Sequence, residues 1–267
     1  MQYTGKTISS PHNDEVKQLA RLVQNSRERR KQGLMVLEGI HLIQSCLEAG
    51  LLPQRVYVNA QALAHAEVAA LLASLPASCA LAILPEPVMA KASALATPPE
   101  LLALCARPQP AAPAAAAARV LLEDIQDPGN LGTILRCAAA SGVREVLLSK
   151  GCVDVYSPKV LRAGMGAHFV LSIHEQVELE QAMRGFAGRK LVTYLEGSSS
   201  LYSQDLTGAV ALVFGNEGAG VSPALLALAD ARIRIPMPGH AESLNVAMAA
   251  TVCLFERVRQ LELAAAG

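Results

Sequence analysis

The sequence predicts an α/β protein: a mostly parallel sheet with helices on both faces, preceded by a small α/β domain. In the second half of the chain, short apolar runs alternate with helical patterns, which is typical of parallel strands buried on both faces. Between the halves, the stretch ARPQPAAPAAAAAR at 106–119 has three prolines, an alanine run and no hydrophobic periodicity. With 267 residues, 52% hydrophobic and 17% charged, the chain is long enough to fill two cores.

A basic segment opens the chain. Between Lys17 and Gln32 lie six Lys or Arg residues against one acid, Glu28. Such a run is typical of a solvated helix face and, equally, of a surface that binds phosphate groups. We expect it to form a helical or flexible arm ahead of the first domain.

The first domain is expected to be a small α/β unit. Residues 34–50 predict a strand followed by an amphipathic helix, with Gly50 as the C-terminal stop of that helix. Further strands are expected within 54–60 and 79–85, with an Ala/Leu-rich helix between them. The predicted order along the chain is a basic arm at 1–32, the small domain at 33–105, a linker at 106–118 and the second domain at 119–267.

The second domain alternates strands with helices. Its strands are expected within 119–124, 144–149, 169–173, 190–196, 209–215 and 231–237. Its helices are expected within 130–142, 159–164 and 178–185, from Pro223, and from Ser243 towards the C-terminus. In open parallel sheets, ligands bind beyond the carboxyl ends of the strands. The loops that follow the strands are therefore where a site is expected.

Bulk composition narrows the functional classes. The formal net charge is zero, so no global field favours nucleic acid or anionic membranes. The six cysteines include no CxxC pair and no histidine stands at zinc-ligand spacing, so no metal site is expected. The N-terminus lacks a signal-peptide core, and no stretch approaches eighteen uninterrupted apolar residues. These features predict a cytoplasmic protein without a membrane span.

The first of three unusual strand-end loops is DPGNLGTILR. Asp127-Pro128-Gly129 is expected to form a turn, and Asn130 is expected to cap the helix that follows. Arg136 lies in the middle of this otherwise apolar helix, where it must reach solvent, pair with an acid or serve a ligand. An ordinary surface arginine is the alternative.

The other two loops are glycine-rich and polar. GNEGAG at 215–220 allows the backbone to approach a ligand closely, but its spacing is neither G-x-G-x-x-G nor that of a P-loop. Glu217 would repel a phosphate, so a nucleotide pyrophosphate is disfavoured there. The third loop, at 236–245, leads into the last helix with Ser243 as its expected cap. Hydroxyl and amide groups at such a place suit an anion or a ribose.

Together these loops resemble the three ordered motifs of the SpoU (TrmH-like) RNA ribose 2′-O-methyltransferases, within the SPOUT superfamily. The similar stretches are DPGNLGTILRCAAASG, LVFGNEGAGVS and IRIPMPGHAESLNVAMA, and the resemblance covers about 120–261. The first domain, with VLEGIHLIQSCLEAG, is similar to the substrate-binding domain of many members. The resemblance implies a C-terminal trefoil knot, S-adenosylmethionine bound inside it, and a homodimer whose active site is assembled at the subunit interface.

The resemblance also implies the site residues. Those at cofactor-binding positions are Leu195, Glu196, Gly197, Gly215, Ile235, Met237 and Leu244. Those at the polar catalytic positions are Arg136, Asn130, Glu217, Ser243 and Asn245. Methyl transfer from a sulfonium needs an in-line approach and removal of a proton, and it needs no metal. Arg136 matches the residue proposed as catalytic in the family. A guanidinium stays protonated in proteins and cannot accept a proton, so we expect Arg136 to hold the substrate phosphate.

RNA is the partner that the resemblance implies, because RNA carries the ribose 2′-hydroxyl that DNA lacks. The basic arm and the first domain would bind it. An N-terminal substrate domain favours ribosomal RNA, with 23S rRNA first, over tRNA. The alternatives are a tRNA 2′-O-methyltransferase and a catalytically silent RNA-binding or ribosome-assembly protein. A dinucleotide-dependent oxidoreductase is disfavoured, because both G-x-G-x-x-G and the acidic residue expected about 20 positions later are missing.

Overall fold

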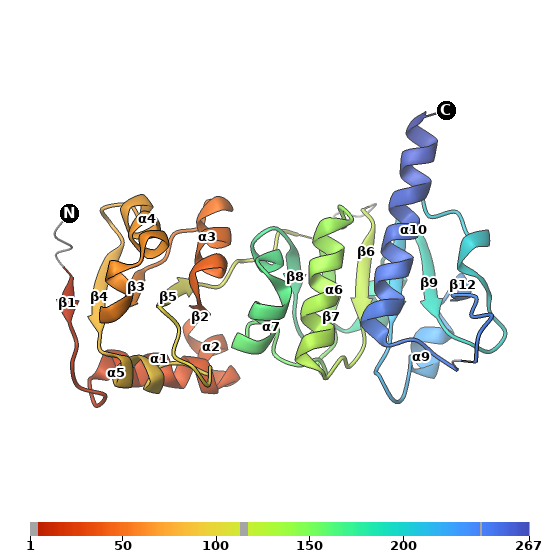
Figure 1. The fold of residues 1–267 in the computed structure, drawn as a ribbon. Coiled ribbons are helices and arrows are strands. Elements are labelled where there is room, and N and C mark those ends of the chain that lie inside the picture. The colour runs from red at the N-terminus through yellow and green to blue at the C-terminus, as the bar shows by residue number, and fades with distance from the viewer. Residues whose placement is uncertain (1–4, 113–116, 241, 267) are drawn as a thin grey trace. The chain divides into compact units, whose positions relative to one another are not determined.

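The computed structural model describes residues 5–112, 117–240 and 242–266, which form two compact units (Figure 1). Unit 1 takes the chain up to Pro108 together with the excursion Tyr156–Phe169. Unit 2 takes the rest of the chain. The excursion could not be predicted from the sequence, because its helix has the same pattern as the other helices of the second half.

Unit 1 is built on a five-stranded mixed sheet. Its strands lie in the order β1 (Lys6–Thr7), β4 (Ala80–Leu84), β3 (Arg55–Asn59), β5 (Leu101–Ala106) and β2 (Leu34–Glu38). β1, β4 and β3 are parallel, whereas β5 runs antiparallel to both β3 and β2. Its helices are α1 (Asp14–Gln24), α2 (Ser26–Gln32), α3 (Ile40–Glu48), η1 (Ala60–Ala64), α4 (Ala66–Ser74), α5 (Glu86–Lys91), α7 (Pro158–Gly164) and η2 (Ala167–Phe169).

The predicted elements of the first domain are present. β2, α3, β3, α4 and β4 lie where they were expected, and Gly50 follows α3 with a left-handed φ of 75°. β5 was not predicted, because a short apolar run such as LLALCA has no period that separates strand from helix.

The basic segment forms α1 and α2. α1 places Val16, Leu19 and Leu22 in the core of unit 1. Arg29 is only 4% exposed, and its guanidinium donates to the carbonyl oxygens of Leu22 and Val23 at the end of α1. One of the six basic residues is therefore structural. The five exposed ones are Lys17, Arg21, Arg27, Arg30 and Lys31.

The excursion is held to unit 1 by an ion pair between a half-buried arginine and a buried carboxylate. Arg162 of α7 contacts the carboxylate of Glu38 at 2.5 Å, and Glu38 is 5% exposed. The same carboxylate accepts hydrogen bonds from the Ser93 hydroxyl and the Ala94 N–H. Removing one partner would leave a charge buried without compensation, which is strongly destabilising. α7 is thus an integral part of unit 1.

Unit 2 is a seven-stranded, fully parallel sheet. The order is β10 (Ser199–Ser200), β12 (Ala231–Arg234), β9 (Arg189–Thr193), β11 (Val210–Phe214), β6 (Arg119–Leu122), β7 (Glu145–Leu148) and β8 (Ser172–His174). The helices are α6 (Pro128–Ala140), α8 (Leu179–Arg184), η3 (Leu201–Ser203), α9 (Pro223–Leu226) and α10 (Val246–Ala266). The predicted α/β class, with a mostly parallel sheet and a small domain before it, is confirmed.

The helices of unit 2 lie on both faces of this sheet. α8 and α9 share one core with the strands, through Leu121, Leu147 and Val213 among others. α6 and α10 pack side by side (Figure 1). The chain moves across the sheet in opposite directions from β6 to β7 and from β8 to β9, so right-handed crossovers place α6 opposite α8. The strand expected within 169–173 is partly wrong: Ala167–Phe169 form a 3-10 turn, and β8 begins only at Ser172.

Candidate functional site

A cavity of about 410 Å³ lies in unit 2, where β9, β11 and β12 end. Of the residues expected to contact a cofactor, six line it: Leu195, Glu196, Gly215, Ile235, Met237 and Leu244. Two of the expected catalytic residues, Glu217 and Ser243, line it as well. Gly197 follows Glu196 with a left-handed φ of 61°, but it does not line the cavity. Eight of the twelve predicted site residues thus converge on one space at the carboxyl ends of neighbouring strands, and Asn130, Arg136 and Asn245 also lie outside its lining.

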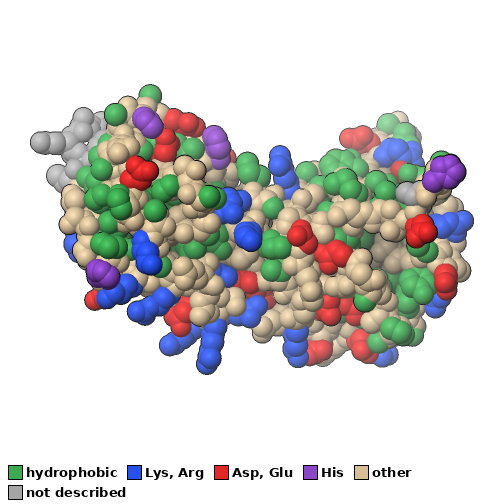
Figure 2. All heavy atoms as spheres, turned by 60° about the horizontal axis from the view of Figure 1, so that its bottom comes forward, with side chains coloured by type: hydrophobic (Ala, Val, Ile, Leu, Met, Phe, Trp, Pro, Cys, Tyr) green, Lys and Arg blue, Asp and Glu red, His purple; other side chains and the backbone are tan. Residues whose placement is uncertain are grey.

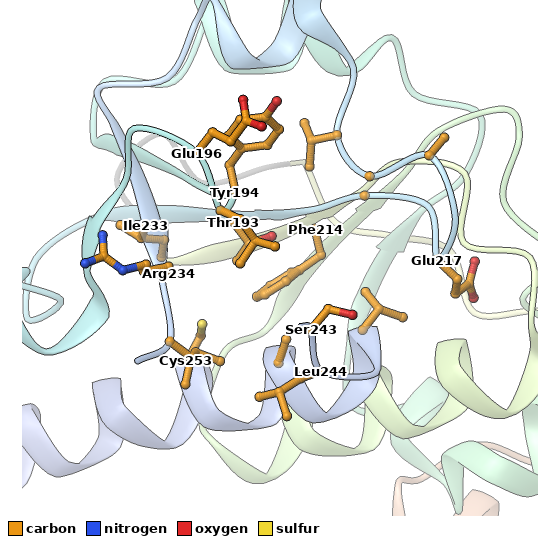
Figure 3. A pocket seen from close by; sticks show the side chains of 18 of the residues that line it. Thr193, Tyr194, Glu196, Phe214, Glu217, Ile233, Arg234, Ser243, Leu244 and Cys253 are labelled. Atoms are coloured by element: carbon orange, nitrogen blue, oxygen red, sulfur yellow. The ribbon is translucent and has the colours of Figure 1, made fainter. Parts of the chain in front are cut away.

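Several lining residues were not predicted. Phe214, Ile233 and Thr193 lie at the strand ends in Figure 3, and Cys253 comes from α10. Phe214 and Cys253 are buried, so this part of the cavity is apolar. Val246, Ala249 and Cys253 share helical spacing i, i+3, i+7, which could have identified the face of the last helix that meets the strands.

The glycine loop between β11 and α9 folds back on itself. Asn216 and Gly220 exchange backbone hydrogen bonds at 3.0 and 2.9 Å. The side-chain oxygen of Asn216 accepts from the N–H groups of Gly218 and Ala219, both at 2.9 Å. Gly215 packs directly beneath this turn, since a Cβ there would lie 2.2 Å from the carbonyl carbon of Gly220. The absence of a side chain at Gly215 is what lets the loop close.

Glu217 connects the glycine loop to the loop before α6. Its carboxylate accepts from the N–H groups of Gln126 at 3.3 Å and Asp127 at 3.2 Å, and from the Asn130 amide at 3.0 Å. Burial alone would raise the pKa of Glu217, but hydrogen bonds from Asn130 and from backbone N–H groups outweigh it and hold the pKa below its ordinary value. The carboxylate is therefore charged at neutral pH and joins two motif loops.

Asn130 carries the connection on to the third motif. Its side-chain oxygen accepts from the amide of Asn245 at 2.9 Å. The oxygen of Asn245 in turn accepts from the N–H groups of Ala247 and Met248, at the start of α10. Three of the five predicted catalytic residues thus form one chain of hydrogen bonds, Glu217–Asn130–Asn245, across the three motifs.

Two expected helix caps are wrong. α6 begins at Pro128, so residues 127–129 are not a free turn, and Asp127 is the cap: its carboxylate accepts from the Asn130 N–H at 2.8 Å. A proline suits the first helical position because its φ is already helical and its missing N–H is not needed. At α10 the capping side chain is Asn245 rather than Ser243. The Asn130 amide is therefore not used for capping and joins Glu217 to Asn245, which both caps α10 and donates to Asn130.

Arg136 is exposed on α6 and does not line the cavity. Its guanidinium has no hydrogen bond or ion pair with any residue that the structure describes. The next residue, Cys137, packs against Thr251 of α10, with 3.1 Å between sulfur and hydroxyl. Arg136 therefore stands on the α6–α10 surface, apart from the hydrogen-bonded chain and available to a group outside this chain.

Within residues 5–112, 117–240 and 242–266, no helix is both long and apolar enough to cross a membrane. In the same ranges, no three His, Cys, Asp or Glu side chains gather in a way that could hold a metal ion.

Known proteins share both units. Residues 117–255 match the SpoU rRNA Methylase family, and residues 13–103 match the MRM3-like substrate binding domain. An uncharacterized tRNA/rRNA methyltransferase of Synechocystis sp. is 34% identical over 95% of this chain and 94% of its own. The 23S rRNA (guanosine(2553)-2′-O)-methyltransferase RlmP of Bacillus subtilis is 31% identical over 94% and 98%. The crystal structure of the SpoU methyltransferase AviRb from Streptomyces viridochromogenes, in complex with AdoMet, is 28% identical with a TM-score of 0.82, over 93% and 98%.

Proposed function

We propose that this chain, which belongs to the SpoU rRNA Methylase family, transfers a methyl group from S-adenosylmethionine to a ribose 2′-hydroxyl of ribosomal RNA. One observation carries the proposal: two of the three motif loops line one cavity, and hydrogen bonds of Glu217, Asn130 and Asn245 join the first motif loop to them. The relatives named above support 23S rRNA as the substrate, and the name of the Synechocystis relative keeps tRNA as the alternative.

The cavity fits the cofactor. It is apolar at Phe214 and Ile233, which suits an adenine ring, and its glycine loop offers backbone groups instead of a phosphate cradle. Glu196 and Glu217 put carboxylates at its lining, which is compatible with a cationic sulfonium and unfavourable for a pyrophosphate. S-adenosylmethionine supplies an electrophilic methyl group when bound. Leu195, Met237 and Leu244 would hold it from the loops.

Arg136 would act on the RNA. Its exposed guanidinium can form two parallel hydrogen bonds to a phosphate next to the target ribose, which aligns the 2′-oxygen. The proton of the 2′-hydroxyl would pass to that phosphate. Ser243, Asn130 and Asn245 would set the geometry of the loops around the reacting atoms.

A second copy of the chain is expected to complete the site. α10 exposes Met248 and Phe255, 52% and 44% exposed, on the helix pair that also carries Arg136. Large apolar side chains gathered on one face are typical of a contact surface. We propose a homodimer formed through this face, which would bring Arg136 to the partner's cavity, and a trefoil knot at the C-terminal end of unit 2. The proposed substrate and the six free cysteines favour a cytoplasmic location.

The proposed activity predicts a specific loss in cells. Deleting the gene should remove one or a few 2′-O-methyl groups from 23S rRNA, and the purified protein should restore them with labelled S-adenosylmethionine. Mapping 2′-O-methylation in both ribosomal and transfer RNA checks this. Loss of a methyl group from tRNA alone would identify tRNA as the substrate. Unchanged methylation maps together with no methyl transfer in vitro would contradict the proposed activity and favour an RNA-binding protein without catalysis.

The exposed cations of α1 and α2 are expected to bind RNA phosphates. Figure 2 shows Lys and Arg side chains gathered along unit 1. Replacing Arg21, Arg27 and Lys31 together with alanine should weaken RNA binding and lower the slope of log K against log salt by roughly two, at about 0.7 per lost phosphate contact. Filter binding over a salt series measures both.

These substitutions test the RNA contact more directly than a deletion of the basic arm and the first domain, residues 1–105, would. The deletion would remove the strands and helices on which α7 packs, including Glu38, the partner of Arg162. The matched control replaces three exposed cations of unit 2, Arg144, Lys150 and Arg184. If the slope of log K against log salt is unchanged in the α1–α2 variant, these helices do not contact RNA phosphates.

A further inference from the structure

Asp124 has an unusual backbone conformation beside the glycine loop. It is the second residue after β6, and its φ is 55° although it is not glycine. This left-handed region is disfavoured for residues with a Cβ, and Asp tolerates it better than most. A disfavoured conformation persists where the surroundings enforce it, and it marks places where geometry matters for function.

The side chain of Asp124 is held by the loop after β7. Its N–H donates to the Ser149 hydroxyl oxygen at 2.8 Å, and that hydroxyl donates to the Asp124 carboxylate at 2.5 Å. Gly151 packs against the same carboxylate, because a Cβ at Gly151 would lie 2.1 Å from one of its oxygens. Serine and glycine together thus fix both the main chain and the side chain of Asp124.

The carbonyl of Asp124 is directed at the glycine loop. Its oxygen accepts from the Asn216 amide at 2.8 Å. Asn216 is the residue around which the loop turns, and it follows Gly215 of the cavity. The neighbour Glu123 accepts from the Ser222 N–H at 2.7 Å, where the loop ends. Both ends of the loop are therefore attached to two consecutive residues after β6.

We infer that Asp124 is a positioning residue for the cofactor cavity. It does not line the cavity and acts through Asn216: the left-handed backbone aims the carbonyl that fixes the glycine loop in its binding shape. The inference rests on the proposed function for the identity of the ligand, S-adenosylmethionine. If the loop loses this shape part of the time, the apparent Kd equals the intrinsic Kd divided by the fraction of molecules that remains competent.

Two substitutions of Asp124 separate backbone from side chain. Asp124→Gly keeps the carbonyl and adopts the left-handed region without strain. Asp124→Ala keeps a Cβ but loses the carboxylate that accepts from the Ser149 hydroxyl. We expect Asp124→Ala to raise the Kd and the KM for S-adenosylmethionine about tenfold, with kcat at saturating cofactor nearly unchanged. Asp124→Gly should stay within about threefold of wild type. Calorimetry and initial rates measure these values.

A third variant and a control keep the test decisive if Asp124→Ala folds poorly. Asn216→Asp is isosteric and preserves the oxygen that Gly218 and Ala219 use, but it removes the donor to Asp124. It should weaken cofactor binding by about the same tenfold. Lys150→Ala, in the exposed part of the loop after β7, should bind as wild type does.

The outcomes are distinguishable. Normal affinity in both Asp124→Ala and Asn216→Asp overturns the inference and leaves the proposed function intact. Equal weakening by Asp124→Gly and Asp124→Ala also overturns it, because the carboxylate and not the direction of the carbonyl would then set the affinity. A wild-type protein that binds no S-adenosylmethionine contradicts the proposed function itself.

Discussion

Arg136→Ala is expected to lower methyl transfer by about 10²- to 10⁴-fold, the range of a positioned catalytic group, while S-adenosylmethionine binds almost as in wild type. The arginine is exposed and has no hydrogen bond or ion pair among the described residues, so its removal breaks no contact within this chain. It also lies outside the lining of the cavity. The loss should therefore appear in kcat and not in cofactor affinity.

Single-turnover transfer from labelled S-adenosylmethionine to an rRNA fragment checks this result, with calorimetry for cofactor binding. Arg136→Lys should also be slow, because an ammonium cannot form the paired hydrogen bonds that a guanidinium makes to a phosphate. Arg184→Ala is the matched control, since Arg184 is an exposed arginine on α8, across the sheet from α6. Near-normal transfer by Arg136→Ala would remove this residue from catalysis.

The sequence predicted the sheet of unit 2 well because its strands are apolar runs with clear ends. β11, for example, is buried at every residue, and glycine follows it at once. Motif residues such as Gly215 and Leu244 could be assigned to one cavity, because strand-end loops of a parallel sheet meet at one edge. Local pattern and topology together were sufficient for the general location of the site.

The partners of Glu217 could not be predicted, because its carboxylate accepts from residues about 90 positions earlier in the chain. No periodicity encodes such a pairing. The predicted cap of α6 was wrong for a different reason. Asp127 and Asn130 are both good capping residues, three positions apart, and only the preference of Pro128 for the first helical position identifies Asp127 as the cap. The role of Asp124 could not be predicted either, because the sequence does not show which residue other than glycine has a left-handed backbone.

Gly215→Ala is expected to abolish S-adenosylmethionine binding, raising the Kd by at least about a hundredfold, or about 2.7 kcal/mol. A Cβ at this position would lie 2.2 Å from the carbonyl carbon and oxygen of Gly220, and 2.4 Å from the nitrogen of Val221. All three are backbone atoms of the same loop, so no side-chain rotation relieves the contact. The loop must open, and the backbone pairing of Asn216 with Gly220 is lost.

Gly218→Ala provides a matched control three residues away. A Cβ there would meet only the side-chain oxygen of Asn216 at 3.6 Å, an ordinary van der Waals contact. Calorimetric titration should therefore give near-wild-type affinity for Gly218→Ala and no measurable binding for Gly215→Ala. Thermal unfolding shows whether each variant remains folded. If a folded Gly215→Ala variant binds S-adenosylmethionine within a few-fold of wild type, this loop does not contribute to cofactor binding.

Co-expression of the two inactive variants tests where Arg136 acts. In a dimer whose site combines the cavity of one chain with the arginine of the other, an Arg136→Ala chain contributes an intact cavity and a Gly215→Ala chain an intact arginine. One complete site then forms in each mixed dimer, and methyl transfer returns to about half of the wild-type rate per dimer, since one of its two sites is whole. If both groups must come from the same chain, every site lacks one of them. Mixed dimers without activity would therefore confine Arg136 to the cavity of its own chain.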